Sequence, residues 1–227
     1  MSDPEFDDQL RKMRQDWDRR ARENARYYVN TAQTEWTDEE FFASGEQTVR
    51  EEILPELATI CAGRDPARMR VLEIGCGAGR VTRALAQIFG RVYAVDVSGE
   101  MIARARASLA DFRNVFLYHN NGADLSVLPD LPFHFAFSCI VFQHIPSREV
   151  IESYVRDAAR LLRPGALFKF QVQGNTAIES RRDDTWLGVP FSEQQVMQMA
   201  WRCGFEPRFR HGAGEQYFWQ WFVRNAH

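Results

Sequence analysis

The stretch VLEIGCGAGR, residues 71–80, joins a short apolar run to three glycines at alternating positions. Apolar residues then recur at helical spacing from Val81 to Phe89, so the sequence predicts a buried strand, a tight turn and a helix. Glycines accept positive φ angles and carry no side chain, which lets the backbone pass close to a bound ligand. The helix that starts here adds free N–H groups, so this turn is the first candidate for a ligand site.

A second predicted strand, residues 91–95, leads into Asp96, which stands 21 residues after Gly75. An acidic residue at the end of this strand can accept hydrogen bonds from both hydroxyls of a ribose. The sequence therefore predicts that the chain binds a cofactor containing a nucleoside.

The glycine spacing separates two kinds of cofactor. A dinucleotide site has the pattern G-x-G-x-x-G, whereas this chain has G-x-G-x-G at residues 75–79. Glu73 precedes the first glycine by two positions, where a carboxylate would repel a pyrophosphate and attract a cation. The run E-x-G-x-G-x-G with an acidic residue after the next strand resembles the class I S-adenosylmethionine-dependent methyltransferases. The resemblance covers roughly residues 69–224 and implies a cofactor that carries a sulfonium and an ammonium but no phosphate.

The resemblance also implies that the matching positions contact four parts of the cofactor: the methionine part, the ribose, the faces of the adenine ring and its edge. Asn121 stands where the family usually has an aspartate that accepts from the adenine amino group, and its amide oxygen can still accept. For Arg80 two interpretations stay open, a contact with the cofactor's carboxylate or an exposed side chain in the first helical turn. The implied cofactor-binding residues are Glu73, Gly75, Cys76, Gly77, Gly79, Arg80, Asp96, Val97, Met101, Asn121, Gly122 and Phe142.

The rest of the chain predicts the remaining strands of the fold. The last strand, 216–223, is apolar on both faces, as expected of a strand buried on both sides. A terminal hairpin whose last strand inserts into the sheet is the methyltransferase arrangement, whereas dehydrogenase domains finish with a parallel strand. We expect an α/β fold with a doubly wound, mostly parallel seven-stranded sheet and a C-terminal antiparallel hairpin. The other strands are predicted at 71–74, 91–95, 115–118, 133–142, 166–172 and 205–210.

Residues 1–63 are predicted to form a helical extension before a core at residues 64–227. One helix is expected from Phe6 to Tyr28, with a basic face that is either solvated or a surface for an anionic partner. Gly45 is expected to end a second helix, and Pro55 to kink a third. The resemblance implies that such an extension folds over the cofactor as a lid. Five aromatic residues are therefore expected either at the mouth of the site or in the core: Tyr27, Tyr28, Trp36, Phe41 and Phe42.

His144 follows the fourth predicted strand, at the edge where open α/β sheets bind ligands. Imidazole titrates near neutrality, so His144 is the tentative general base; the alternative is a histidine bonded to loop backbone. Aromatic side chains around the site favour a flat or apolar small molecule, or an amine held by cation–π contact. The candidate substrate residues are Tyr28, Gln173, Trp186, Tyr217 and Trp219.

Composition limits the other possibilities. A length of 227 residues with 45% hydrophobic content suits one globular domain with an extension, and a net charge of −3 gives no reason to expect nucleic acid. The four cysteines have no C-x-x-C spacing, so neither a metal site nor a disulfide framework is predicted, and a reducing cytoplasm is expected. The sequence contains no apolar run of the ~18 residues that a membrane span needs.

The leading hypothesis is a methyltransferase that uses S-adenosylmethionine and methylates an O or N atom of a small molecule, mainly by positioning it for in-line displacement. One alternative is a non-catalytic cofactor-binding subunit that acts on a partner through the basic face. A second is a nicotinamide-dependent oxidoreductase, which the glycine spacing and Glu73 disfavour. The sequence does not indicate which oligomeric state the chain adopts.

Overall fold

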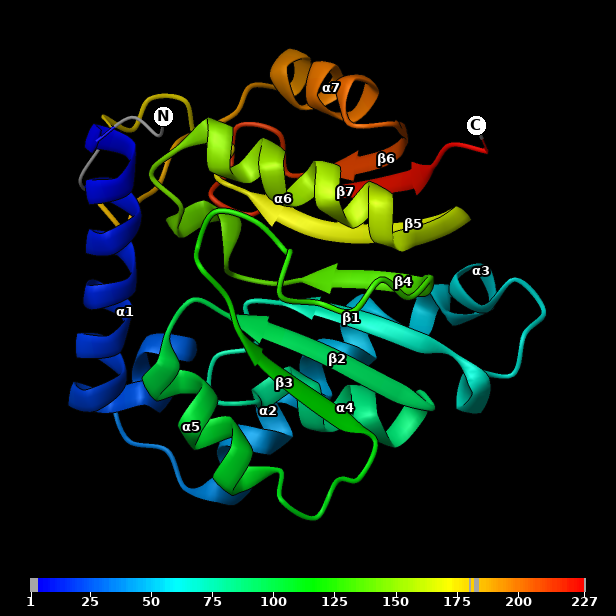
Figure 1. Cartoon of the computed structure of the whole chain (residues 1–227), viewed down its shortest axis with the longest axis horizontal. Coiled ribbons are helices and arrows are strands. Elements are labelled where there is room, and N and C mark those ends of the chain that lie inside the picture. The colour runs from blue at the N-terminus through cyan, green and yellow to red at the C-terminus, as the bar shows by residue number, and fades with distance from the viewer. Residues whose placement is uncertain (1–3, 180, 182–183, 227) are drawn as a thin grey trace.

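A single mixed sheet organises the chain. The computed structural model describes residues 4–179, 181 and 184–226, and within them seven strands pair in the order β3-β2-β1-β4-β5-β7-β6 (Figure 1). The five neighbouring strands β3, β2, β1, β4 and β5 pair in parallel, whereas β7 is antiparallel to both β5 and β6. The predicted fold is confirmed, including the last strand inside the sheet. The strands are β1 Arg70–Ile74, β2 Arg91–Asp96, β3 Val115–His119, β4 Phe133–Ser138, β5 Leu162–Val172, β6 Phe205–His211 and β7 Phe218–Arg224.

Helices cover both faces of the sheet, while α1 stands beside the carboxyl ends of the parallel strands (Figure 1). Alternation along β1 shows the two layers: Leu72 and Ile74 pack in the cluster that contains α6 and α7, and Val71 packs in the cluster of α3 and α4. No helix in the described part of the chain is both long and apolar enough to cross a bilayer. The helices are α1 Pro4–Val29, α2 Asp38–Glu52, η1 Leu54–Glu56, α3 Leu57–Cys61, η2 Pro66–Arg68, α4 Arg80–Ile88, α5 Gly99–Ser108, η3 Phe142–His144, α6 Arg148–Leu161 and α7 Glu193–Arg202.

The extension differs from its prediction at two residues. Gly45 does not end a helix, because α2 continues through it to Glu52. A Cβ atom at Gly45 would lie 2.0 Å from the Arg80 carbonyl oxygen, so this glycine allows α2 to pack tightly on α4. At Pro55 the chain breaks rather than kinks: α2 ends, and the short helices η1 and α3 follow.

The predicted fourth strand is too long. β4 ends at Ser138, and Ile140 adopts a φ of +58°, a conformation that β-branched residues rarely take. The Ile140 N–H donates to Gln171 Oε1 at 2.7 Å, which helps to hold this strained turn. The turn carries residues 139–145 away from the sheet at its carboxyl edge, where a ligand site is expected.

Candidate functional site

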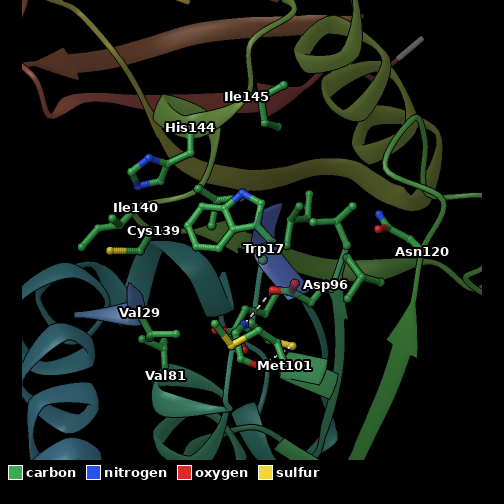
Figure 2. A pocket seen from close by; sticks show the side chains of 18 of the residues that line it. Trp17, Val29, Val81, Asp96, Met101, Asn120, Cys139, Ile140, His144 and Ile145 are labelled. Atoms are coloured by element: carbon green, nitrogen blue, oxygen red, sulfur yellow. Dashed lines mark hydrogen bonds between the residues drawn. The ribbon is translucent and has the colours of Figure 1, made fainter. Parts of the chain in front are cut away.

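A cavity enclosing about 830 Å³, open solvent at its mouth included, lies at the carboxyl ends of β1, β2 and β4. The glycine turn and Asp96 line it from the sheet, and Met13 and Trp17 line it from α1. In Figure 2 the Trp17 indole lies between His144 on one side and Asn120 on the other. We call this space the first cavity.

Two glycines of the turn are required by close contacts. Gly75 has a φ of +79°, and a Cβ atom there would lie 2.2 Å from Val141 Cγ2. Gly77 has a φ of +52°, and its Cβ atom would lie 2.6 Å from Val29 Cγ2. The turn is therefore pressed between the loop after β4 and the end of α1, a packing that side chains would prevent.

Asp96 is held in place by the turn and by the start of α5. Its Oδ2 accepts from the Gly77 N–H at 2.8 Å, and its Oδ1 accepts from the Ser98 N–H at 2.9 Å. Burial raises the pKa of Asp96, while these hydrogen bonds act in the opposite direction. The carboxylate is thus oriented by backbone donors, and an oxygen can accept further hydrogen bonds from a ligand.

Glu73 and Arg80 bring opposite charges to the same cavity. Glu73 is 4% exposed, and its Oε2 accepts from Thr82 Oγ1 at 2.6 Å. Burial raises the pKa of Glu73 to about 7, although Thr82 and Arg80 act against the rise. Arg80 is also 4% exposed, which excludes the exposed alternative; its Nη1 donates to Ser44 O and Thr48 Oγ1, while its Nε has no partner. A zwitterionic ligand would match these two buried groups.

Asn120 is a residue that the sequence interpretation missed. It is 4% exposed and lines the first cavity, and its Nδ2 donates to Tyr154 Oη at 2.7 Å. Its Oδ1 is buried without a hydrogen-bond partner. Asn121, predicted for this role, is exposed instead, and its Oδ1 accepts from the N–H groups of Ala123 and Asp124. The unmatched acceptor in the cavity therefore belongs to Asn120.

A second cavity, of about 540 Å³ with open solvent included, adjoins the first. Tyr28, Val29, Ile140 and His144 line both cavities and form their shared wall. The predicted substrate residues Gln173, Trp186 and Tyr217 line only the second cavity.

Trp219 does not belong to either cavity. Its ring packs on Phe137, and Lys169 Nζ lies 5.1 Å from the ring centroid. Its neighbour Phe218 belongs to the core cluster on the opposite face, because side chains alternate along β7. The prediction of Trp219 as a cavity residue is therefore wrong.

His144 is 5% exposed and contacts the loop before α7. Its Nδ1 lies 2.5 Å from the Trp186 carbonyl oxygen, so Nδ1 carries the proton and Nε2 has the lone pair. Burial lowers the pKa of His144 to about 4. This neutral imidazole has the loop-backbone bond that the structural alternative predicted, and its role as a base stays a prediction.

Helix α1 is fastened across the first cavity at several places. Asp18 Oδ1 accepts from Ser98 Oγ at 2.6 Å, Arg14 donates to Asn121 O at 2.6 Å, and Arg20 donates to Thr185 O at 3.0 Å. Helical geometry is interrupted at Asn24. The basic face is largely used within the chain, in further pairs that join Arg11 to Asp8, Lys12 and Arg19 to Asp16, Arg22 to Glu100, and Arg26 to Asp38.

The family described as "Methyltransferase domain" matches residues 71–165, which hold the glycine turn, Asp96 and the loop after β4. A probable S-adenosylmethionine-dependent methyltransferase of Mycolicibacterium smegmatis is 31% identical over 133 residues, 59% of this chain and 47% of that protein. These similarities support the class I S-adenosylmethionine-dependent methyltransferase family that the sequence resembles.

Two further proteins resemble this chain. The ubiquinone biosynthesis O-methyltransferase of Xanthomonas axonopodis pv. citri is 32% identical over 111 residues, 48% of this chain and 45% of that protein. The chain therefore spans slightly less than half the length of these curated relatives. The structure of magnesium protoporphyrin IX methyltransferase from Synechocystis PCC 6803 has a TM-score of 0.67 at 17% identity, covering 96% of this chain and 100% of that one, which shows the shared fold.

The fold brings most of the predicted cofactor residues together around the first cavity. Gly79, Asn121, Gly122 and Phe142 do not line the first cavity; the Phe142 ring packs on Tyr154, Phe168 and Phe170 in the core. Of the five extension aromatics, Tyr28 reaches both cavities, whereas Phe41 and Phe42 are core residues. The predicted residues that line the first cavity are Tyr28, Glu73, Gly75, Cys76, Gly77, Arg80, Asp96, Val97, Met101 and His144.

Proposed function

We propose that the chain binds S-adenosylmethionine in the first cavity and transfers its methyl group to an oxygen or nitrogen atom of a small molecule. The observation that carries the proposal is the set of unmatched polar groups in that cavity. A buried carboxyl at Glu73, an arginine with a free Nε at Arg80 and an unpaired acceptor at Asn120 lie around one space. These groups fit a ligand with an amino-acid end and a nucleoside end, and no phosphate.

Each residue has a proposed binding role. Asp96 accepts from the ribose hydroxyls, and Asn120 Oδ1 accepts from the adenine amino group. Arg80 faces the ligand's carboxylate, and Glu73 provides negative charge near its cationic groups. Val97 and Met101 pack against the adenine. The roles of Gly79, Asn121, Gly122 and Phe142 are then indirect, through the shape of the turns on which they lie.

The bound cofactor supplies an already activated methyl group. When bound, it would supply a methyl group that the acceptor's lone pair can take while the sulfur keeps the electron pair of the broken bond, and the acceptor's proton would leave to solvent after the transfer. The protein therefore acts by holding the acceptor in line and excluding water. We propose that residues 1–63 serve this end as an extension over a core at 64–227, since Met13 and Trp17 of α1 cover the first cavity.

The likeness to a ubiquinone biosynthesis O-methyltransferase supports a small-molecule acceptor. Among the described residues, no group of three potential metal-binding side chains occurs. All four cysteines are free, which fits the reducing cytoplasm that we propose as the compartment.

Calorimetry with S-adenosylhomocysteine and with NADH tests the proposal. We expect affinity in the nanomolar to micromolar range for S-adenosylhomocysteine and none for NADH; the reverse would indicate an oxidoreductase and reject the proposal. Transfer of radiolabelled methyl groups to small acceptors then separates an enzyme from a non-catalytic subunit. A chain that binds the cofactor product, methylates no acceptor and forms a stable complex with another protein would be such a subunit.

A further inference from the structure

The second cavity begins where the first ends. Ile140 and His144 form part of the shared wall, and the strained backbone of Ile140 lies at this boundary. A methyl group donated from the first cavity would cross this wall, so an acceptor in the second cavity would be next to it. The chemistry of the second cavity therefore bears on which acceptors the enzyme takes.

Flat, aromatic side chains form part of the lining of the second cavity, beside the aliphatic Val29, Ile140 and Leu187. Tyr28, Trp186 and Tyr217 line it. The Tyr28 and Trp186 rings meet edge to face with centroids 5.8 Å apart, which fixes both of them. Tyr217 is 44% exposed and lies at the open side. Rings in this arrangement favour a planar guest, since stacked and edge-on contacts both need a flat partner.

The second cavity carries no formal charge on the described residues that line it. Its polar members are neutral groups, namely Asn30, Thr31, Gln143, Gln173 and Gln216. Two charged side chains that contact residues near the lining are already engaged: Glu23 accepts from the Tyr28 hydroxyl at 3.0 Å, and Arg20 donates to Thr185 O at 3.0 Å. A carboxylate or phosphate on the acceptor would lose its hydration here without gaining a counter-charge.

One residue that lines this cavity has a hydrogen-bond acceptor without a partner. Gln143 is 2% exposed, and its Oε1 is buried without a hydrogen bond. A chain of contacts orients its amide. His144 Nδ1–H donates to Trp186 O, which leaves Nε2 as an acceptor, and Gln143 Nε2 lies 3.3 Å from it. The amide nitrogen is thus directed to His144, and Oε1 is left for another donor.

We propose that the second cavity is the methyl-acceptor site and that it selects an uncharged, planar aromatic molecule whose O–H or N–H group donates to Gln143 Oε1. His144 is then a positioning residue that fixes the Gln143 amide. This inference rests on the proposed function, because it takes the first cavity as the source of the methyl group.

Matched triads of small aromatic compounds test this inference. Each triad contains a hydroxyl compound, its methyl ether and its carboxylate, built on benzene, naphthalene and quinoline rings. Their binding to the full chain is measured by ligand-detected NMR, with and without saturating S-adenosylhomocysteine. We expect hydroxyl compounds to bind about tenfold more tightly than the ethers, because an ether leaves Gln143 Oε1 unpaired, and the carboxylates to bind least.

Two variants assign the preference to Gln143. Gln143→Leu should remove the preference for hydroxyl over ether, and Gln143→Glu, which keeps the shape, should shift binding towards 2-naphthylmethylammonium. Gln47→Leu, at an exposed glutamine on α2, is the matched control and should behave like the wild type. Thermal unfolding shows that each variant is folded before it is compared.

The outcomes separate the two proposals. If S-adenosylhomocysteine does not bind, the proposed function fails, and the triads measured without it still report the selectivity of the second cavity. If S-adenosylhomocysteine binds but carboxylates bind as well as hydroxyl compounds, the inference is overturned. Binding of no triad member, or a hydroxyl preference that survives in Gln143→Leu, also overturns it.

Discussion

The two cavities share a wall but differ in chemistry. The first contains buried ionisable groups at Glu73, Arg80 and Asp96, whereas the described lining of the second carries no formal charge and combines aromatic, amide and aliphatic side chains. The first is built mainly by the carboxyl edge of the sheet, whereas the second is assembled from α1, the loops after β4 and β5, and the turn before β7. A charged site on rigid strands suits a cofactor common to many enzymes, and a neutral site on loops suits an acceptor that differs between them.

The largest expected effect is on stability, because Glu73 in the first cavity and His144 in the shared wall have pKa values shifted in opposite directions. Glu73 has a pKa of about 7 against an ordinary value of 4.5, so its contribution to the free energy of unfolding falls as pH rises through this range. His144 has a pKa of about 4 against 6.5, so its contribution falls as pH drops. Between pH 4.5 and 6.5 the two slopes cancel in the wild type.

Single variants should expose each slope. Glu73→Gln should make the free energy of unfolding rise with pH relative to the wild type, and His144→Gln should make it fall, each by about 1.4 kcal/mol per pH unit. Urea denaturation across this pH window measures both, with Glu39→Gln at an exposed carboxylate as the control. If the free energy of unfolding changed with pH in the same way in both variants, the opposite pKa shifts of Glu73 and His144 would be contradicted.

Asp96→Asn should weaken S-adenosylhomocysteine binding by about 100-fold, because charge-assisted hydrogen bonds to the ribose are worth roughly 3 kcal/mol together. Calorimetry measures the change. Asp130→Asn is the matched control, since the Asp130 side chain is 91% exposed and remote from the first cavity. Equal affinity in the two variants would remove Asp96 from the binding site.

Asn120→Ala should reduce the same affinity by about tenfold, because it removes the unpaired acceptor from the first cavity. Asn121→Ala is a close comparison at the next residue and should leave the affinity nearly unchanged, although it perturbs the turn at Ala123 and Asp124. Calorimetric titration of both variants with S-adenosylhomocysteine measures the two affinities. The opposite order would return the adenine contact to Asn121.

The smallest expected effect concerns His144, which we expect to leave the pH profile of catalysis unchanged near neutrality. Because the pKa of His144 is about 4, its imidazole stays neutral from about pH 5 to pH 8. The pH profile of kcat/KM should therefore show no inflection from His144 in that range, once an acceptor is in hand. An inflection near the ordinary histidine value that disappears in His144→Gln would show a titrating base.

The first cavity was largely predictable because its main residues lie in one contiguous motif. A strand, a glycine turn and an acidic residue after the next strand define their own geometry through local rules. Local rules did not distinguish Asn120 from Asn121. Which of these two neighbouring amides enters the cavity depends on the turn after β3, and contacts with Asp124 set that turn.

The second cavity was predictable only in part, because residues far apart in the sequence form it. Gln173, Trp186 and Tyr217 were predicted, but Trp219 was included wrongly, because it lies inside β7 and packs on Phe137, whereas Tyr217 lies in the turn before this strand. Gln143 carries no local signal of its role. Its unpaired oxygen becomes visible only when His144, Trp186 and the buried surroundings are placed together.

A crystal structure of the complex with S-adenosylhomocysteine tests the central claim most directly. We predict the ribose hydroxyls on Asp96, the adenine amino group on Asn120, and the sulfur turned to the wall formed by Ile140 and His144, so that a methyl group would point into the second cavity. A ligand bound outside the first cavity, or a sulfur directed away from this wall, would contradict the account.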